Sequence, residues 1–132
     1  ILPMYYRNCN AVLLCFDTSL SIKENVKFIK YWLKEIEAHA DNNDRTIILV
    51  GTKVDLIDDS VLVNIRRVIK SHFENIIYFN TSAKTNYGIE EMFDKILNIC
   101  IENTCDAGKL EIHNIIVDNK SRYNYSNWCN LI

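Results

Sequence analysis

Three short apolar runs, at residues 11–16, 47–50 and 76–79, constrain the fold of this chain more than any other feature. None of them alternates apolar with polar residues. Uninterrupted runs of this length are typical of strands that are covered on both faces, as in a parallel sheet. A segment with a helical pattern follows each run, and this order predicts an α/β fold. We expect a doubly wound, mostly parallel sheet with helices on both faces.

The helical segments are recognised by apolar residues at spacings of three and four, which places these residues on one face of a helix. Their stripes are Ile22, Val26, Ile29, Leu33 and Ile36, then Leu62, Ile65, Ile69 and Phe73, and then Ile89, Met92, Phe93, Ile96, Leu97 and Cys100. Residue types suited to capping precede each stripe. We therefore expect N-caps at Thr18 or Ser19, at Ser60, and at Thr85 or Asn86.

The composition limits the class of protein. A length of 132 residues suits one domain, and a net charge of −2 with scattered Lys and Arg residues argues against binding to nucleic acid. The first residues do not form a signal peptide, and no apolar run is long enough to span a membrane. Because the chain does not begin with Met, we expect it to be a fragment. We expect residues 1–103 to fold as a domain and residues 104–132 to form a variable, largely flexible tail.

The five cysteines do not suggest a metal site, because no Cys-x-x-Cys pair is present and the three His residues are far apart. Cys9, Cys15 and Cys100 lie in or beside apolar runs. We expect these three to be buried thiols of a reducing compartment.

Two short motifs follow the second and third apolar runs. The first reads Gly-Thr-Lys-Val-Asp at residues 51–55, and the second reads Thr-Ser-Ala-Lys at residues 81–84. Either motif alone is an ordinary solvated turn. Ligands of parallel α/β sheets bind at the carboxyl ends of the strands, where both motifs fall. Their occurrence at consecutive strand ends therefore favours one shared binding site.

The residue types in the two motifs suit the recognition of guanine. An ionised Asp55 can accept two parallel hydrogen bonds from the N1–H and amino groups of the base. The main-chain N–H of Ala83 can donate to O6, and the small side chain lets the backbone approach closely. Lys53 can lay its methylene groups on the face of the base while its ammonium stays in water.

The other motif residues are expected to support this arrangement. Thr52 can tie its loop to neighbouring backbone through its hydroxyl, and Ser82 can brace the second turn. Lys84 can cover the other face of the base or pin Asp55.

The chain resembles the small Ras-like GTPases, and most closely the Rab branch, over residues 1–103. Residues 52–55 match the family's Asn/Thr-Lys-x-Asp element and residues 82–84 its Ser-Ala-Lys element. Leu2-Pro3-Met4-Tyr5-Tyr6-Arg7 is similar to the end of the switch II region of Rab proteins, and the resemblance makes Tyr5 and Tyr6 partner-binding residues. Core packing is the alternative for Tyr5 and Tyr6. It is the simpler explanation for Trp32, which stands where Rab proteins often carry a Trp.

The sequence lacks the family's phosphate loop, Gly-x-x-x-x-Gly-Lys-[Ser/Thr], its switch I Thr and its Asp-x-x-Gly element. In the family these parts bind the phosphates, hold Mg²⁺ and position the attacking water. The resemblance thus implies the C-terminal part of a P-loop small GTPase domain, with no catalytic or metal-binding residue and with Mg²⁺ only through the missing N-terminal half. We expect this piece alone to be inactive, and poorly soluble because residues 11–16 would form an exposed apolar edge.

As a full-length member, the protein would bind GTP and GDP and hydrolyse GTP as a switch in vesicle-mediated transport. The resemblance implies exchange factors, activating proteins and effectors of Rab type, and a place on the cytosolic face of an endomembrane. One alternative is a truncated interaction module that binds no nucleotide. Another is a Ras- or Rho-like member, which residues 5–7 argue against and Thr52 mildly favours.

A cysteine near the C-terminus gives a second indication of membrane attachment. Cys129 is fourth from the end, as in a prenylation box, although the next residue is Asn130 rather than an aliphatic one. A single prenyl chain without a basic cluster would anchor the protein weakly. A plain free thiol is the alternative.

Overall fold

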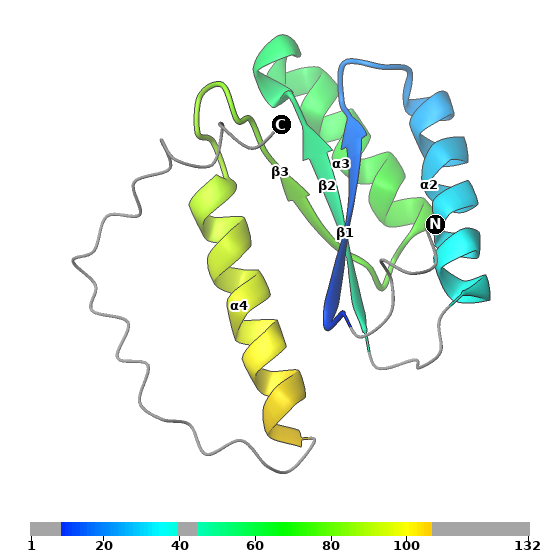
Figure 1. The fold of residues 1–132 in the computed structure, drawn as a ribbon. Coiled ribbons are helices and arrows are strands. Elements are labelled where there is room, and N and C mark those ends of the chain that lie inside the picture. Colours follow the sequence, from blue (N-terminus) through cyan, green and yellow to red (C-terminus); the bar gives the residue numbers. More distant parts are fainter. Residues whose placement is uncertain (1–8, 40–44, 107–132) are drawn as a thin grey trace, which may run out of the picture.

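The structure is a computed structural model that describes residues 9–39 and 45–106 (Figure 1). Its strands are β1 (Ala11–Asp17), β2 (Thr46–Thr52) and β3 (Ile77–Asn80). Its helices are α2 (Ile22–Ala38), the short 3-10 helix η1 (Val54–Leu56), α3 (Asp59–His72) and α4 (Ile89–Asp106). The expected partner-binding residues Tyr5 and Tyr6 lie outside the described residues, and so do residues 107–132 of the expected tail (104–132) with its Cys129. Residues 104–106, which were expected to begin the tail, still belong to α4.

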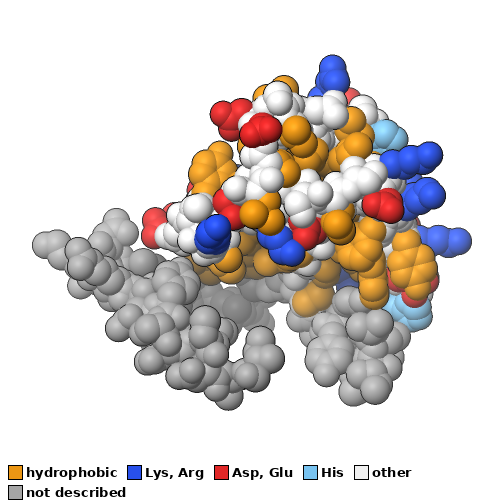
Figure 2. Space-filling view, turned by 90° about the horizontal axis from the view of Figure 1, so that it is seen from above, with side chains coloured by type: hydrophobic (Ala, Val, Ile, Leu, Met, Phe, Trp, Pro, Cys, Tyr) orange, Lys and Arg blue, Asp and Glu red, His pale blue; other side chains and the backbone are white. Residues whose placement is uncertain are grey.

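The strands form a parallel sheet in the order β1-β2-β3. Asp17 at the end of β1 pairs with Thr52 at the end of β2, and Gly51 of β2 pairs with Asn80 at the end of β3. All three strands therefore end at one edge of the sheet, which we call the carboxyl edge. It is at the top of Figure 1, and Figure 2 views the molecule from that side.

Helices cover both faces of the sheet, which confirms the predicted α/β fold. Helices α2 and α3 pack on one face and α4 packs on the other (Figure 1). Adjacent residues of β2 point to opposite faces: Leu49 joins the core with α2 and α3, whereas Ile48 and Val50 join the core with α4. Ile48 and Leu49 are both 0 % exposed, as expected for a strand covered on both sides.

Strand β1 differs from this expectation, since the helices of the described part of the chain cover only one of its faces. Leu14 and Phe16 belong to the core with α2 and α3, but Leu13 is 37 % exposed and Cys15 is exposed. The prediction of a buried Cys15 is wrong because the core that α4 forms draws on β2 and β3, leaving this face of β1 bare. Cys9 and Cys100 are half-buried, so full burial is wrong for them too.

The predicted N-caps are also wrong. Helix α2 begins after Ser21 and α3 after Asp58, whose main-chain oxygens accept the first helical hydrogen bonds. The candidates Thr18 and Ser19 instead bond to the ends of the strands. Ser60 lies inside α3, and α4 begins at Ile89, beyond Thr85 and Asn86.

The carboxyl edge is packed too tightly for a side chain at Gly51. A Cβ there would lie 2.7 Å from Tyr78 Oη and 2.9 Å from Thr18 Cγ2. Burial raises the pKa of Tyr78 to about 12, so its hydroxyl stays protonated and donates to the Asn80 side chain.

We expect Gly51→Ala to lower the free energy of unfolding by about 1–3 kcal/mol through overpacking, as measured by urea denaturation of the full-length protein. In a Tyr78→Phe background the same substitution is expected to cost less, because the nearer clashing atom is gone. Equal costs in both backgrounds would contradict this explanation.

Candidate functional site

The loops after β2 and β3 are joined through their main chains. Thr81 N donates to the Gly51 carbonyl at 2.7 Å, and Val54 N donates to the Thr81 carbonyl at 3.2 Å. The first bond continues the pairing of β2 with β3, and the second fastens η1 to the next loop. The two motifs predicted to share a site therefore lie against each other at the carboxyl edge.

The Asp55 carboxylate is held by the neighbouring loop. Ser82 Oγ donates to Asp55 Oδ1 at 2.5 Å, and Lys84 Nζ lies 3.9 Å from Asp55 Oδ2. The Asp55 side chain is 12 % exposed, whereas that of Lys84 is 78 % exposed, so solvent weakens this ion pair. A carboxylate offers about four acceptor positions. One hydrogen bond from Ser82 therefore leaves room for two parallel hydrogen bonds from a ligand.

The turn at residues 82–87 holds Ser82 in place and presents Ala83. Ser82 is fully buried; its N–H donates to the Tyr87 carbonyl at 3.0 Å, and its Oγ accepts from Thr85 N at 3.2 Å. Ala83 is exposed, and no acceptor for its N–H is found among residues 9–39 and 45–106. The N–H that follows the fixed Ser82 is thus free to donate to a ligand.

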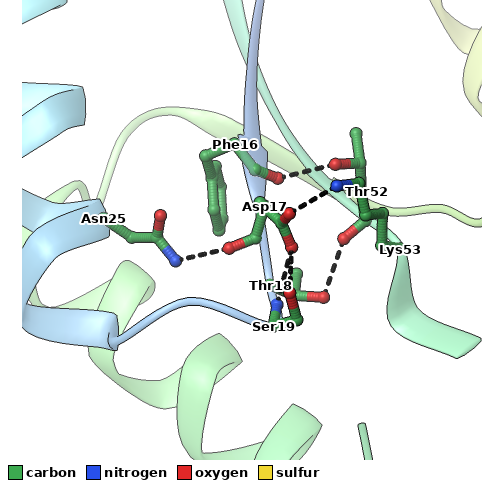
Figure 3. A network of polar contacts seen from close by, with 7 residues as sticks. All are labelled: Phe16, Asp17, Thr18, Ser19, Asn25, Thr52 and Lys53. Atoms are coloured by element: carbon green, nitrogen blue, oxygen red, sulfur yellow. Dashed lines mark hydrogen bonds and ion pairs between the residues drawn. The ribbon is translucent and has the colours of Figure 1, made fainter. Parts of the chain in front are cut away.

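The end of β1 supplies a third loop to the same site (Figure 3). Thr52 Oγ1 donates to the Phe16 carbonyl at 3.0 Å, which is the main-chain tie expected of its hydroxyl. In return, Thr18 donates to the Thr52 carbonyl through its N–H at 3.1 Å and its hydroxyl at 2.7 Å. These bonds fix the backbone immediately before Lys53, which adopts a left-handed conformation with φ +61°.

The Lys53 ammonium is paired with Asp17 across this loop. Lys53 Nζ lies 2.7 Å from Asp17 Oδ2, while Asp17 Oδ1 accepts from the Ser19 N–H at 2.9 Å and the Ser19 hydroxyl at 2.6 Å. The hydrogen bond from Lys53, with those from Ser19, lowers the pKa of Asp17 to about 2. The carboxylate therefore stays ionised at every pH near neutrality.

All six motif residues lie in these two joined loops or at the strand end that leads into the first: Thr52, Lys53, Asp55, Ser82, Ala83 and Lys84. Reasoning from the sequence missed the third loop, with its contacts from Asp17, Thr18 and Asn25. A signal for it existed, since Asp17 ends the first of three strands that were predicted to be parallel. Parallel strands carry their carboxyl ends to the same edge.

The described part of the chain has neither a membrane-spanning helix nor a cluster of metal ligands. No helix of residues 9–39 or 45–106 has the length and apolar character that crossing a membrane requires. In the same residues, no three His, Cys, Asp or Glu side chains gather as ligands for a metal ion.

Comparison with known proteins agrees with the resemblance found in the sequence. The family model described as "Ras family" matches residues 1–102. The putative ras-related protein Rab-5B of Dictyostelium discoideum is 37 % identical over 102 residues, which are 76 % of this chain and 46 % of that protein. Human Ras-related protein Rab-30 is 34 % identical over 93 residues, 70 % of this chain and 44 % of its own length.

A third relative, Ras-related protein Rab-4 of Dictyostelium discoideum, is 31 % identical over 111 residues, which are 84 % of this chain and 52 % of that protein. The chain spans about half the length of the curated relatives it matches. The family match nevertheless covers most of the chain, and the relatives carry Rab names. This protein belongs to the Ras family of small GTPases and is most similar to its Rab members.

Proposed function

We propose that this chain supplies the guanine-recognising part of a GTP-binding, Rab-like small GTPase. The observation that carries the proposal is the contact between the two motifs, in which Ser82 holds one Asp55 oxygen at 2.5 Å and Lys84 lies 3.9 Å from the other. An acceptor group and an unengaged N–H from adjacent loops suit the edge of a purine that carries both donors and an acceptor.

The chemistry of these groups favours guanine over adenine. The Asp55 carboxylate can accept from the N1–H and amino groups of guanine, and the Ala83 N–H can donate to O6. Adenine lacks this pair of donors and would leave the carboxylate desolvated and unpaired. Sites that reject a ligand in this way discriminate by about 10⁴-fold or more.

Exposed apolar residues support the proposal that further parts of a Ras-family domain pack against this chain. On the sheet face that α4 covers, Leu13 and Cys15 of β1 are exposed. On α4 itself, Phe93, Leu97 and Ile101 follow one another at intervals of four residues and are 42–58 % exposed. Apolar surface left bare in this pattern suits burial under another part of a domain.

The wider role follows from family membership and is likewise a proposal. A Rab-like GTPase would hydrolyse GTP to GDP as a switch in vesicle-mediated transport, with exchange factors, activating proteins and effectors as partners. It would work on the cytosolic face of an endomembrane, with Cys129 as a prenylation site. In such proteins, hydrolysis depends on the groups that bind the phosphates, hold Mg²⁺ and position the attacking water. We assign none of the described residues to them.

Nucleotide selectivity tests the base-recognition proposal. We expect the full-length protein to bind GDP at least about 10⁴-fold more tightly than ADP. Inosine diphosphate, which lacks only the amino group, should bind about 10- to 100-fold more weakly than GDP, because one hydrogen bond to a charged acceptor is lost. Competition against a fluorescent GDP derivative measures the affinities for all three diphosphates. Affinities for ADP and GDP within tenfold, or no nucleotide binding at all, would refute the proposal.

A further inference from the structure

The feature that the proposed function leaves unexplained is the ion pair between Asp17 and Lys53. Lys53 Nζ lies 2.7 Å from Asp17 Oδ2. The Asp17 side chain is 21 % exposed and the Lys53 side chain is 59 % exposed. The ion pair links the end of β1 to the loop that carries Asp55 (Figure 3). Exposed ion pairs hold flexible side chains only weakly. What this pair can do therefore depends on how firmly its two ends are fixed.

The Asp17 end is fixed by hydrogen bonds that do not involve Lys53. Both Ser19 donors engage Oδ1, which leaves Oδ2 for the ammonium. The Asp17 carbonyl accepts from Asn25 Nδ2 at 2.8 Å, and Asn25 is only 3 % exposed. The carboxylate is thus held in position by contacts other than the ion pair.

The Lys53 end is fixed through its backbone. The residue has φ +61°, which non-glycine residues seldom adopt, and the Thr52 carbonyl before it accepts two hydrogen bonds from Thr18. Lysine loses more side-chain entropy on ordering than most residues. When both ends of such a side chain are held beforehand, a ligand that packs on its methylene groups meets a smaller ordering cost.

We propose that Asp17 is a positioning residue of the nucleotide site, which pre-orders the Lys53 side chain through the ion pair without touching the nucleotide. The inference rests on the proposed function, because Lys53 has to pack against the base for its ordering to matter. It assigns a role in nucleotide retention to the loop after β1, which neither motif includes.

The test is a double-mutant cycle on the rate of GDP release from the full-length protein. Asp17→Asn keeps an oxygen for Ser19 but turns an amide N–H toward the ammonium, and Lys53→Met keeps an apolar stem but removes the charge. We expect Asp17→Asn to release GDP about fivefold faster, the upper end of the effect of an exposed ion pair, because both ends of this pair are fixed. In the Lys53→Met background, Asp17→Asn should change the rate less than about twofold, because the ion pair is already absent.

Glu74→Gln is the matched control, since it removes one exposed carboxylate just before β3, at the opposite edge of the sheet. It should leave GDP release unchanged. An unchanged rate in Asp17→Asn would overturn the inference, and so would a fivefold effect that persists without the Lys53 ammonium, because Asp17 would then act through the fold alone. If wild-type protein binds no GDP, the proposed function fails and this inference with it. Normal GDP binding with no effect of Asp17→Asn defeats the inference only.

Discussion

The Asp55→Asn variant is expected to exchange guanine for xanthine as the preferred base of the site. In xanthine the amino group of guanine is replaced by a carbonyl oxygen, while N1–H is unchanged. A carboxylate suits the two donors of guanine, whereas an amide offers one acceptor and one donor, which suits N1–H and the xanthine carbonyl. We expect GDP affinity to fall by about 10³- to 10⁴-fold. Xanthosine diphosphate (XDP) should then bind more tightly than GDP.

The contacts around Asp55 favour this outcome over a simple loss of structure. Ser82 donates to Oδ1, so the oxygen of the substituted amide is expected to take that position and its nitrogen the position of Oδ2. The nitrogen then meets the amino group of guanine donor to donor. Lys84 is 78 % exposed and can move away from the uncharged amide.

Asp58→Asn is the matched control for this exchange. Asp58 lies three residues further on and is exposed, and its side chain makes no capping hydrogen bond to α3. It should leave the affinities for GDP and XDP unchanged. Equilibrium competition with both diphosphates, together with the unfolding midpoint of each variant, separates base preference from stability. GDP affinity retained within threefold in Asp55→Asn would show that this carboxylate does not read the base.

The order of strands and helices was predictable because it depends on patterns local to each segment. The apolar run that became β2 is covered on both faces, as predicted, but the equally apolar run that became β1 is not. The two runs cannot be told apart by composition. Whether the face of β1 that carries Cys15 is covered depends on where α4 packs. Residues far along the chain set that position.

The candidate site, too, could be predicted from the sequence only in part. The motifs at residues 52–55 and 82–84 could be paired from their places after consecutive strands, and the structure joins them. The role of Thr18 could not be inferred in this way, because a threonine before a helical stripe reads equally well as an N-cap. Only the register of β1 against β2, which sets Asp17 opposite Thr52, directs the Thr18 hydroxyl to the neighbouring loop.

Gly88→Ala is expected to be the most destabilising single substitution we consider. Gly88 has φ +67°, and a Cβ there would lie 2.3 Å from the Asn80 carbonyl oxygen, a main-chain atom at the end of β3. The left-handed conformation costs an alanine about 1–2 kcal/mol, and overpacking adds about 1–3 kcal/mol. We therefore expect the free energy of unfolding to fall by about 2–5 kcal/mol in urea denaturation of the full-length protein.

Asn86→Ala separates the two contributions, because Asn86 has φ +61° and already carries a Cβ. That variant should lose only about 1 kcal/mol, the conformational part. Gly88→Ala should also release GDP faster, since relieving the clash moves Asn80 and with it the turn that presents Ser82 and Ala83. Equal losses of stability in the two variants would mean that the backbone at Gly88 yields without strain. The close approach to Asn80 would then not be what requires a glycine.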